Sequence, residues 1–204
     1  MLISDIRRTA ADRYTICFDD GSELRSCLAV ITELKLFKGR ALDSAAHEEL
    51  CLRSRRALAR DRAIELVSRR PMSAAELLRK VIEKGEDEDA AEYSVQWLSE
   101  HGFINDESYA AALARHYSNK GFGAGRVKNE LQRRGLDREL WDEALSQMSD
   151  TEDKIDKFIS SRLRDPDDPK EVRRVSAALY RRGFSWEEIR AALRRYDART
   201  EDLE

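Results

Sequence analysis

The feature that most constrains this 204-residue chain is a set of three glycines, each directly after a basic residue. They are Gly85, Gly135 and Gly183, which stand 50 and 48 residues apart. A glycine at a helix end is common, but here apolar residues also occupy the positions four and eight before each glycine and six and ten after it. This shared register predicts an internal repeat. Its apolar positions are Leu77, Val81, Ala91 and Val95, then Val127, Leu131, Trp141 and Leu145, then Val175, Leu179, Ile189 and Leu193.

The central repeat shows how one unit is built. Asn105 stands at a helix N-cap position, and Asp106 and Glu107 add negative charge to the first helical turn. Three apolar stripes at helical spacing then predict three short amphipathic helices. The stripes are Tyr109, Leu113 and Tyr117, then Val127 and Leu131, then Trp141, Leu145 and Met148.

The N-terminal part of the chain has a different pattern. Residues 14–18 alternate and are rich in strand formers, Asp20-Gly21 is a hairpin turn signal, and residues 23–25 can return as the second strand. A hairpin alone is only marginally stable. We therefore expect the apolar residues between 28 and 37, Leu28 and Phe37 included, to cover it as a short helix or a further strand.

Together these patterns predict a mainly α-helical fold of tandem three-helix repeats that form an elongated curved array, with a small N-terminal β-hairpin element. The charged fraction of 38% against 41% hydrophobic residues suits such a thin array. Residues 42–70 are expected to form two successive helical stretches, the first capped by Asp43 or Ser44. The expected divisions are 1–41 for the hairpin-containing element, 42–102 for the first repeat with its preceding linker helix, 103–149 for the second repeat, 150–199 for the third, and 200–204 for a frayed tail.

The charge balance leaves room for local basic patches. The net charge of −3 combines 37 basic and 40 acidic residues, which argues against a general nucleic-acid coat. The most basic stretch lies between residues 53 and 70. It is either a solvated helix face or a surface that binds phosphate or acidic groups. Its candidate contact residues are Arg53, Arg55, Arg56, Arg60, Arg69 and Arg70.

No motif in the sequence argues for an enzyme. The three histidines lie outside any nucleophile, zincin or kinase motif, and the three cysteines form no C-x-x-C pair, which favours reduced thiols. The acidic run 86–89 fits a helix start better than a metal site. The glycine-rich run 120–126 lacks the G-K-[ST] of a phosphate loop and favours a flexible helix connection closed by Phe122. We therefore expect no catalytic residue, no cofactor and no metal.

The sequence also lacks the marks of a membrane or secreted protein. No stretch approaches the roughly 18 to 20 apolar residues that a membrane span needs. The N-terminal residues carry charge where a signal peptide has its apolar segment. We expect a cytoplasmic protein without membrane contact.

A set of short motifs points to a known family. They are Ser73-Ala-Ala-Glu76-Leu77-Leu78-Arg79-Lys80, Lys84-Gly85, Gly102-Phe103-Ile104-Asn105-Asp106-Glu107-Ser108-Tyr109-Ala110, Lys120-Gly121-Phe122-Gly123, and Arg126-Val127-Lys128-Asn129-Glu130-Leu131 with Arg134-Gly135. These motifs resemble those of the RecX regulatory proteins of bacteria, closely over about residues 57–148 and loosely over the third repeat. The chain departs from the family pattern at Asn105-Asp106, where two acidic residues are usual, and at Ala124, where proline is usual. Both departures concern helix starts.

The resemblance implies a regulator of the RecA recombinase. It implies that the protein lodges along the RecA filament on single-stranded DNA and inhibits ATP hydrolysis, strand exchange and the coprotease activity that triggers the SOS response. We expect a monomer that acts in DNA repair and recombination, with weak or indirect contact to single-stranded or double-stranded DNA.

A helical DNA-binding module that acts without a recombinase partner is the alternative function. The middle and last helices of each repeat, joined around a glycine, are similar in outline to helix-turn-helix pairs. A helix that reads bases needs donors such as Arg, Asn or Gln at its start. The last helices of these repeats instead start with carboxylates, which repel phosphate.

Five basic residues of the central repeat are the candidate partner-binding residues. They lie outside its apolar stripes, so we expect them to be exposed, close to one another and of little importance for folding. Exposed basic groups can meet an acidic surface of the filament or the phosphates of its DNA. Reversing the charge of two of them, Arg126 and Arg133, is expected to leave stability nearly unchanged. The five are Arg115, Arg126, Lys128, Arg133 and Arg134.

Overall fold

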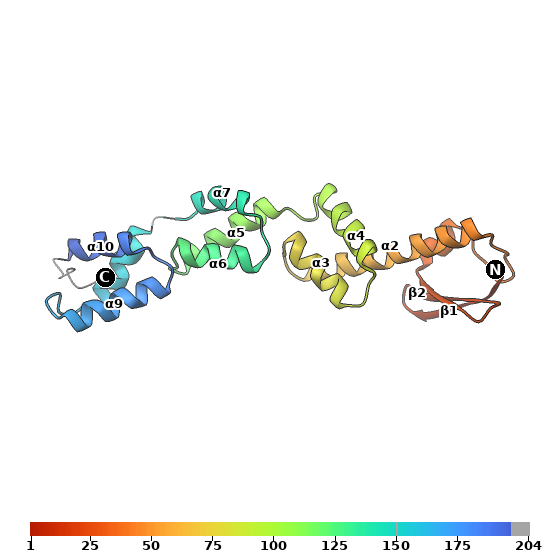
Figure 1. The fold of residues 1–204 in the computed structure, drawn as a ribbon, viewed down its shortest axis with the longest axis horizontal. Coiled ribbons are helices and arrows are strands. Elements are labelled where there is room, and N and C mark those ends of the chain that lie inside the picture. The colour runs from red at the N-terminus through yellow and green to blue at the C-terminus, as the bar shows by residue number, and fades with distance from the viewer. Residues whose placement is uncertain (150, 197–204) are drawn as a thin grey trace. The chain divides into compact units, whose positions relative to one another are not determined.

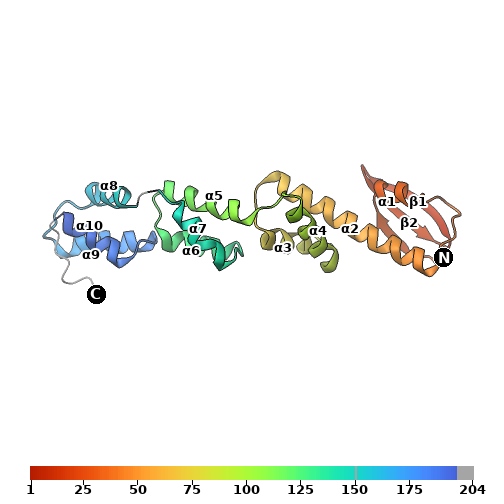
Figure 2. The same cartoon turned by 90° about the horizontal axis from the view of Figure 1, so that it is seen from above.

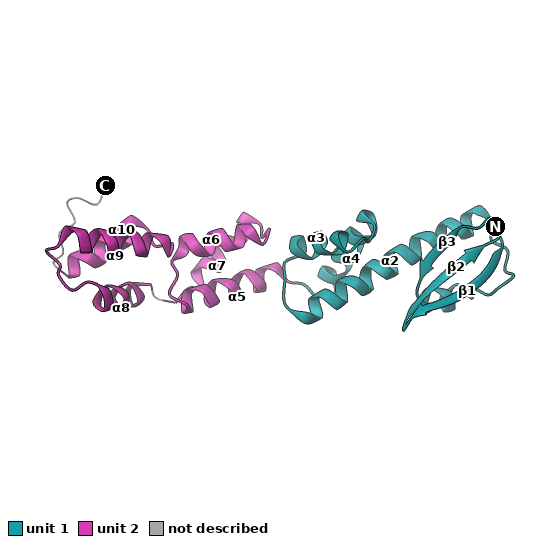
Figure 3. Ribbon diagram, turned by 90° about the horizontal axis from the view of Figure 1, so that it is seen from below, with its two compact units in different colours: residues 1–104 teal, residues 105–204 magenta. Residues whose placement is uncertain are grey.

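The structure is a computed structural model that describes residues 1–149 and 151–196. These residues form a mainly helical fold with a small sheet near the N-terminus, as predicted (Figure 1). The chain divides into two compact units, Met1–Ile104 and Asn105–Glu204 (Figure 3). The tail expected at 200–204 lies outside the described residues, and the division of the chain into four segments and a tail stays a prediction.

The first unit begins with a three-stranded antiparallel sheet in which β2 (Arg13–Phe18) lies between β1 (Ile3–Ala10) and β3 (Glu23–Ser26). The predicted hairpin is confirmed, and Gly21 in its turn has a φ of 86°, a conformation that glycine adopts readily. β1 is a further strand that the sequence pattern did not predict. Its alternation is weak, because Ile3 is the only one of its residues that is buried.

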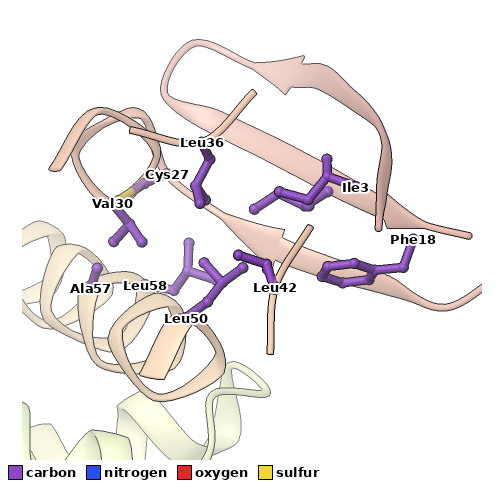
Figure 4. Packing of buried hydrophobic residues seen from close by; sticks show 10 residues of the cluster. Ile3, Phe18, Cys27, Val30, Leu36, Leu42, Leu50, Ala57 and Leu58 are labelled. Atoms are coloured by element: carbon purple, nitrogen blue, oxygen red, sulfur yellow. The ribbon is translucent and has the colours of Figure 1, made fainter. Parts of the chain in front are cut away.

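A core between the sheet and the first helices holds the strands in place (Figure 4). α1 (Leu28–Glu33) contributes Val30 and the loop after it contributes Leu36, so a short helix rather than a strand covers the hairpin. Leu28 and Phe37 were expected in this cover, but they are 47% and 60% exposed. That part of the prediction is wrong, because α1 has six residues and can turn only one side to the sheet, and Phe37 lies beyond it in the loop.

One long helix takes the place of the two helical stretches expected between residues 42 and 70. This helix is α2 (Ser44–Arg69), which has 26 residues, and it leads away from the sheet in Figure 2. The Asp43 side chain caps α2 by accepting a hydrogen bond from the Ala46 amide at 2.8 Å, as predicted. Up to Leu58 its buried residues pack against the sheet, and from Ala59 onward they pack against the next helices. α2 therefore belongs to two cores.

The second half of α2 forms a three-helix domain with α3 (Ala74–Glu83) and α4 (Glu88–Glu100). The Ser73 hydroxyl caps α3 by accepting from the Glu76 amide at 3.0 Å. Gly85, which follows α3, has a φ of 85°, so the chain can turn sharply towards α4. The core of this domain contains the four residues of the predicted repeat register, Leu77, Val81, Ala91 and Val95.

The second unit contains two groups of helices, each with its own core. The first group starts at the predicted cap, where the Asn105 side chain accepts from the Ser108 amide at 2.7 Å. The second group ends with a helix that starts at a capping box made by Ser185 and Glu188. The helices are α5 (Asp106–Asn119), α6 (Ala124–Arg133), the 3-10 turn η1 (Arg138–Leu140) with α7 (Trp141–Ser146), α8 (Glu152–Arg162), α9 (Pro169–Arg181) and α10 (Trp186–Arg195).

The repeat register is confirmed in this unit, with one difference. Trp141 and Leu145 are only partly buried, because α7 has six residues and its core position is taken by Ala144. The Trp141 indole still donates a hydrogen bond to the Leu136 carbonyl at 3.0 Å. The fully buried register residues are Val127, Leu131, Leu179, Ile189 and Leu193, and Val175 is 2% exposed.

The two groups of helices meet at three glycines, Gly123, Gly125 and Gly183, which we call the glycine joint. The Gly123 amide donates to the Arg182 carbonyl at 3.0 Å, and the Gly125 amide donates to the Gly183 carbonyl at 2.9 Å. A Cβ atom would lie 2.4 Å from the Gly183 oxygen if added to Gly123, and 2.2 Å from the Arg126 nitrogen if added to Gly183. The glycine run was predicted to be a flexible helix connection, but two of its glycines instead make a backbone contact with another helical domain.

Candidate partner-binding surface

Most arginines of the basic stretch on α2 have acidic partners within the first unit. Arg53 lies 2.8 Å from Glu33, and Arg55 lies 3.4 Å from Asp87, which also caps α4. Glu86, whose side chain is 7% exposed, adds counter-charge for Arg25 and Arg62. The acidic run 86–89 therefore caps a helix and neutralises arginines. The remaining pairs are Arg69 with Glu65 and Arg70 with Glu76.

Arg56 and Arg60 lie against aromatic rings. The Arg56 guanidinium carbon is 3.8 Å from the centre of the Tyr93 ring, and that of Arg60 is 5.2 Å from the Trp97 ring. A cation–π contact holds a guanidinium in place without neutralising its charge. Together with Arg53, these residues line a hollow of about 340 Å³. Of the six predicted residues between 53 and 70, Arg56 and Arg60 are thus the two that form no ion pair among the described residues.

The five predicted residues of the central domain do not behave alike. Glu130, a side chain that is 5% exposed, lies 3.3 Å from Arg126 and 2.6 Å from Arg133. Arg134 donates to the Tyr109 hydroxyl at 2.5 Å. These three arginines therefore have internal partners, a buried carboxylate and a partly buried tyrosine, which the sequence pattern did not predict, and their small importance for folding stays a prediction.

Arg115 and Lys128 fit the prediction better. Both are exposed, Arg115 on α5 and Lys128 on α6. Within the part of the chain that the structure describes, no acidic side chain forms an ion pair with either. These two residues are therefore the central-domain candidates that can meet a partner without first losing an internal contact.

The third helical domain has a basic surface that the sequence patterns did not single out. Four arginines line a hollow of about 810 Å³, which we call the arginine basin: Arg162 at the end of α8, Arg164 in the loop after it, and Arg174 and Arg181 on α9. Arg162 and Arg182 also contact one aromatic ring, with guanidinium carbons 4.8 Å and 4.7 Å from the centre of Phe158. Only the packing of α8 on α9 brings these residues together. The sequence signal was the density of arginine between 162 and 182.

Glu171 is the acidic residue that lines the basin, and its carboxylate is already engaged. It accepts hydrogen bonds from the Asp165 amide at 2.9 Å and the Arg164 amide at 3.1 Å, and lies 2.8 Å from Arg174. The amide of Asp165 first, and then that of Arg164, hold the pKa of Glu171 below its ordinary value. The carboxylate stays ionised and balances Arg174.

One cysteine has a histidine beside it. The Cys51 sulfur lies 3.7 Å from His47 Nε2, one turn earlier on α2. Burial raises the pKa of the Cys51 thiol, whereas a nucleophilic cysteine needs a lowered pKa. The i, i+4 spacing was visible in the sequence, but the partly buried environment favours a structural thiol.

Within residues 1–149 and 151–196, no group of three or more His, Cys, Asp or Glu side chains is placed to hold a metal ion. None of the helices described has the length and apolar character required to cross a membrane. The features that stand out are therefore basic and aromatic surfaces of the helical domains.

Comparison with known proteins gives consistent matches. The model of the second three-helix domain of RecX matches residues 105–145, and that of the third matches residues 154–193. Regulatory protein RecX of Xanthomonas axonopodis pv. citri is 35% identical over 136 residues, which cover 65% of this chain and 84% of that protein. The protein of the same name from Pseudomonas entomophila is 32% identical over 133 residues, covering 62% and 84%.

Two solved structures share the fold. The crystal structure of a regulatory protein RecX superposes with a TM-score of 0.71 at 23% identity, over 94% of this chain and 98% of that one. The crystal structure of RecX from Lactobacillus salivarius gives a TM-score of 0.63 at 21% identity, over 70% and 97%. At this level of sequence identity the two structures show that the fold is shared.

Proposed function

This chain belongs to the family of RecX regulatory proteins, and from that premise we propose that it regulates the RecA recombinase by binding the RecA filament on single-stranded DNA. In this proposal, binding inhibits ATP hydrolysis, strand exchange and the coprotease activity that triggers the SOS response. The protein acts by contact rather than by catalysis, as a monomer and without a cofactor.

Family membership is the observation that carries the proposal, and the repeated domains support it. Three helical domains use the same apolar register for their cores, so the chain presents one domain architecture several times. A filament is itself repetitive, and several weak contacts along it add up to firm binding because each further contact is intramolecular. A repetitive filament is therefore a suitable partner for a chain of repeated helical domains.

We propose Arg115 and Lys128 as the central-domain contacts, with Arg56 and Arg60 as the candidates in the first unit. The choice rests on charge that the fold does not neutralise: the first two are exposed, and the other two lie against rings. Arg126, Arg133 and Arg134 are better explained by their internal contacts.

The test is a titration of the protein into an ATPase assay of recombinase on single-stranded DNA, with binding to free DNA measured in the same salt. Inhibition at concentrations that leave free DNA unbound supports a filament regulator. If inhibition instead follows the occupancy of free DNA, the alternative of a DNA-binding module that needs no recombinase partner is the better account.

A matched pair of variants tests the contact residues. We expect Lys128→Glu to weaken inhibition, because an acidic surface or a phosphate would then face a carboxylate. Lys38→Glu makes the same charge change at an exposed lysine in the loop after α1 and should inhibit as the wild type does. Equal inhibition by both variants would remove Lys128 from the proposed surface.

A further inference from the structure

The arginine basin holds more positive charge than its surroundings balance. Arg174 is paired with Glu171, but no acidic side chain among the described residues forms an ion pair with Arg162, Arg164 or Arg181. Like charges gathered in one hollow repel one another and weaken the fold. The first unit shows the opposite arrangement, because most of its clustered arginines have carboxylates beside them.

The acidic loop next to the basin does not supply the missing counter-charge. Asp168 accepts a hydrogen bond from the Lys170 amide at 2.9 Å and caps α9, and Asp165 accepts from the Asp167 amide at 2.9 Å. These carboxylates are directed at backbone amides, where they stabilise the loop and the helix start. The basin keeps its positive charge.

The geometry points to the arginine basin as a binding site for the phosphates of a single-stranded nucleic acid. Guanidinium groups bind phosphate oxygens through paired N–H donors, and they stay charged at any physiological pH. Arg162 at the end of α8, Arg164 in the loop after it and Arg181 at the end of α9 line one hollow of about 810 Å³, so they can contact successive phosphates of one strand. A buried binding pocket for one small anion would need a more enclosed set of donors.

An exposed aromatic pair beside the basin favours a single strand over a duplex. The rings of Tyr180 and Trp186 stack with centroids 5.0 Å apart and an interplanar angle of 17°, yet they are 54% and 38% exposed. Arg181 lines both the basin and a second hollow of about 540 Å³, which Tyr180 also lines. Glu188 lines this second hollow, but its carboxylate accepts from Ser185 at 2.7 Å. Unpaired bases can stack on such rings, whereas bases in a duplex are already stacked.

This inference goes beyond the proposed function, because its basic and aromatic residues belong to the third domain and it needs no recombinase, although Lys128 also lines the second hollow. It also assigns the nucleic-acid contact to residues other than the basic stretch on α2. A chain that fails to bind nucleic acid could still regulate a filament through protein contacts. Nucleic-acid binding at the basin and regulation of the filament can therefore be tested separately.

The experiment measures the affinity of the full chain for a labelled oligothymidine by fluorescence anisotropy at several salt concentrations. Three arginine–phosphate contacts predict a slope of log K against log salt of about −2, since each phosphate neutralised on a single strand contributes about −0.7. Arg162→Ala, Arg164→Ala and Arg181→Ala should each make the slope shallower by about 0.7 and weaken binding at low salt. Arg195→Ala is the control in the same domain, because Arg195 is paired with Asp156 at 2.7 Å, and its slope should match the wild type.

The aromatic pair has its own variant and control. Trp186→Leu should weaken oligothymidine binding roughly fivefold or more, the loss expected when one base no longer stacks. Phe37→Leu, a change at a 60% exposed ring in the first unit, should leave binding unchanged. Helical content by circular dichroism shows that each variant is folded.

Several outcomes would overturn the inference. They are a wild-type slope near zero, basin variants with the wild-type slope, or a duplex that competes as well as a single strand of equal length. If Trp186→Leu binds oligothymidine normally but no longer inhibits the recombinase, the aromatic surface contacts protein and not nucleic acid. Normal inhibition by all basin variants, together with lost oligothymidine binding, would support the inference and leave the proposed function intact.

Discussion

Replacing Gly183 by alanine tests the glycine joint, and the structure sets the size of the effect. Gly183 has a φ of 91°, where a residue with a Cβ atom loses about 1 to 2 kcal/mol. The new Cβ would lie 2.2 Å from the Arg126 nitrogen, so the two domains must separate. Separation breaks the hydrogen bonds donated by Gly123 and Gly125, at about 1 kcal/mol each. We expect a total loss of about 3 to 4 kcal/mol.

Gly85 provides the matched control, because it stands at the same register position in the first unit. Its φ is 85°, but nothing lies within 4 Å of an added Cβ atom. Gly85→Ala therefore carries the backbone strain alone, about 1 to 2 kcal/mol. The unfolded chain changes in the same way in both variants, so the difference of about 2 kcal/mol measures the joint.

Amide hydrogen exchange measures the effect at individual residues, since parts of a protein can open without global unfolding. In Gly183→Ala the amides of Gly123 and Gly125 should exchange much faster than in the wild type, while core amides of α5 stay protected. Gly85→Ala should leave both amides at their wild-type rate. Equal losses of stability in the two variants, or unchanged exchange at Gly125, would refute the reasoning that the joint is a stabilising contact.

Four further expectations follow from the packing and the ion pairs. Leu131→Ala removes a fully buried side chain and should lower the free energy of unfolding by about 2 to 5 kcal/mol in chemical denaturation. Arg133→Glu places a second carboxylate beside the buried Glu130, so its thermal midpoint should fall; an unchanged midpoint would restore the view that Arg133 is free for a partner. The depressed pKa of Glu171 means that its contribution to stability is present at neutral pH and is lost as the pH falls through the acid range below the ordinary glutamate value of about 4.3. Glu171→Gln should therefore be less stable than the wild type at pH 7. In thermal melts at decreasing pH, the difference between the two thermal midpoints should shrink. A difference that stays constant with pH would contradict this assignment. Deletion of residues 1–38 should fray the first half of α2 but leave a helical protein that unfolds cooperatively, which circular dichroism can follow; a melt without a cooperative transition would show that the sheet is needed for the rest of the first unit.

The parts of the fold that the sequence predicted are those with a strong local signal. The register of Val81, Leu131 and Leu179 predicted three helical cores, because apolar residues at helical spacing need a common buried side. The hairpin turn was equally local. β1 escaped prediction because most of its side chains are exposed, and a strand can be held by backbone hydrogen bonds to its neighbour without an apolar pattern.

The surface was harder to predict than the core. Helical spacing placed Arg126 and Arg133 outside the apolar stripe correctly, but a carboxylate at position 130 is within reach of both, at spacings of four and three residues. Those spacings alone would have predicted that Arg126 and Arg133 pair with Glu130 and that Lys128 does not. The arginine basin lay beyond such reasoning, because Arg162 and Arg181 come together only through the packing of α8 on α9.

The continuous helix α2 has a mechanical consequence for the first unit. A helix of 26 residues is about 39 Å long, and it is embedded in the sheet core up to Leu58 and in the helical core from Ala59. It therefore works as a rigid spacer that sets both the distance and the rotation between two surfaces. One alanine inserted between Leu58 and Ala59 would leave each core its own residues, yet turn the sheet by about 100° relative to α3 and α4. A partner that contacts both the sheet and the helices α3 and α4 would bind the wild-type chain but not the variant with the inserted alanine.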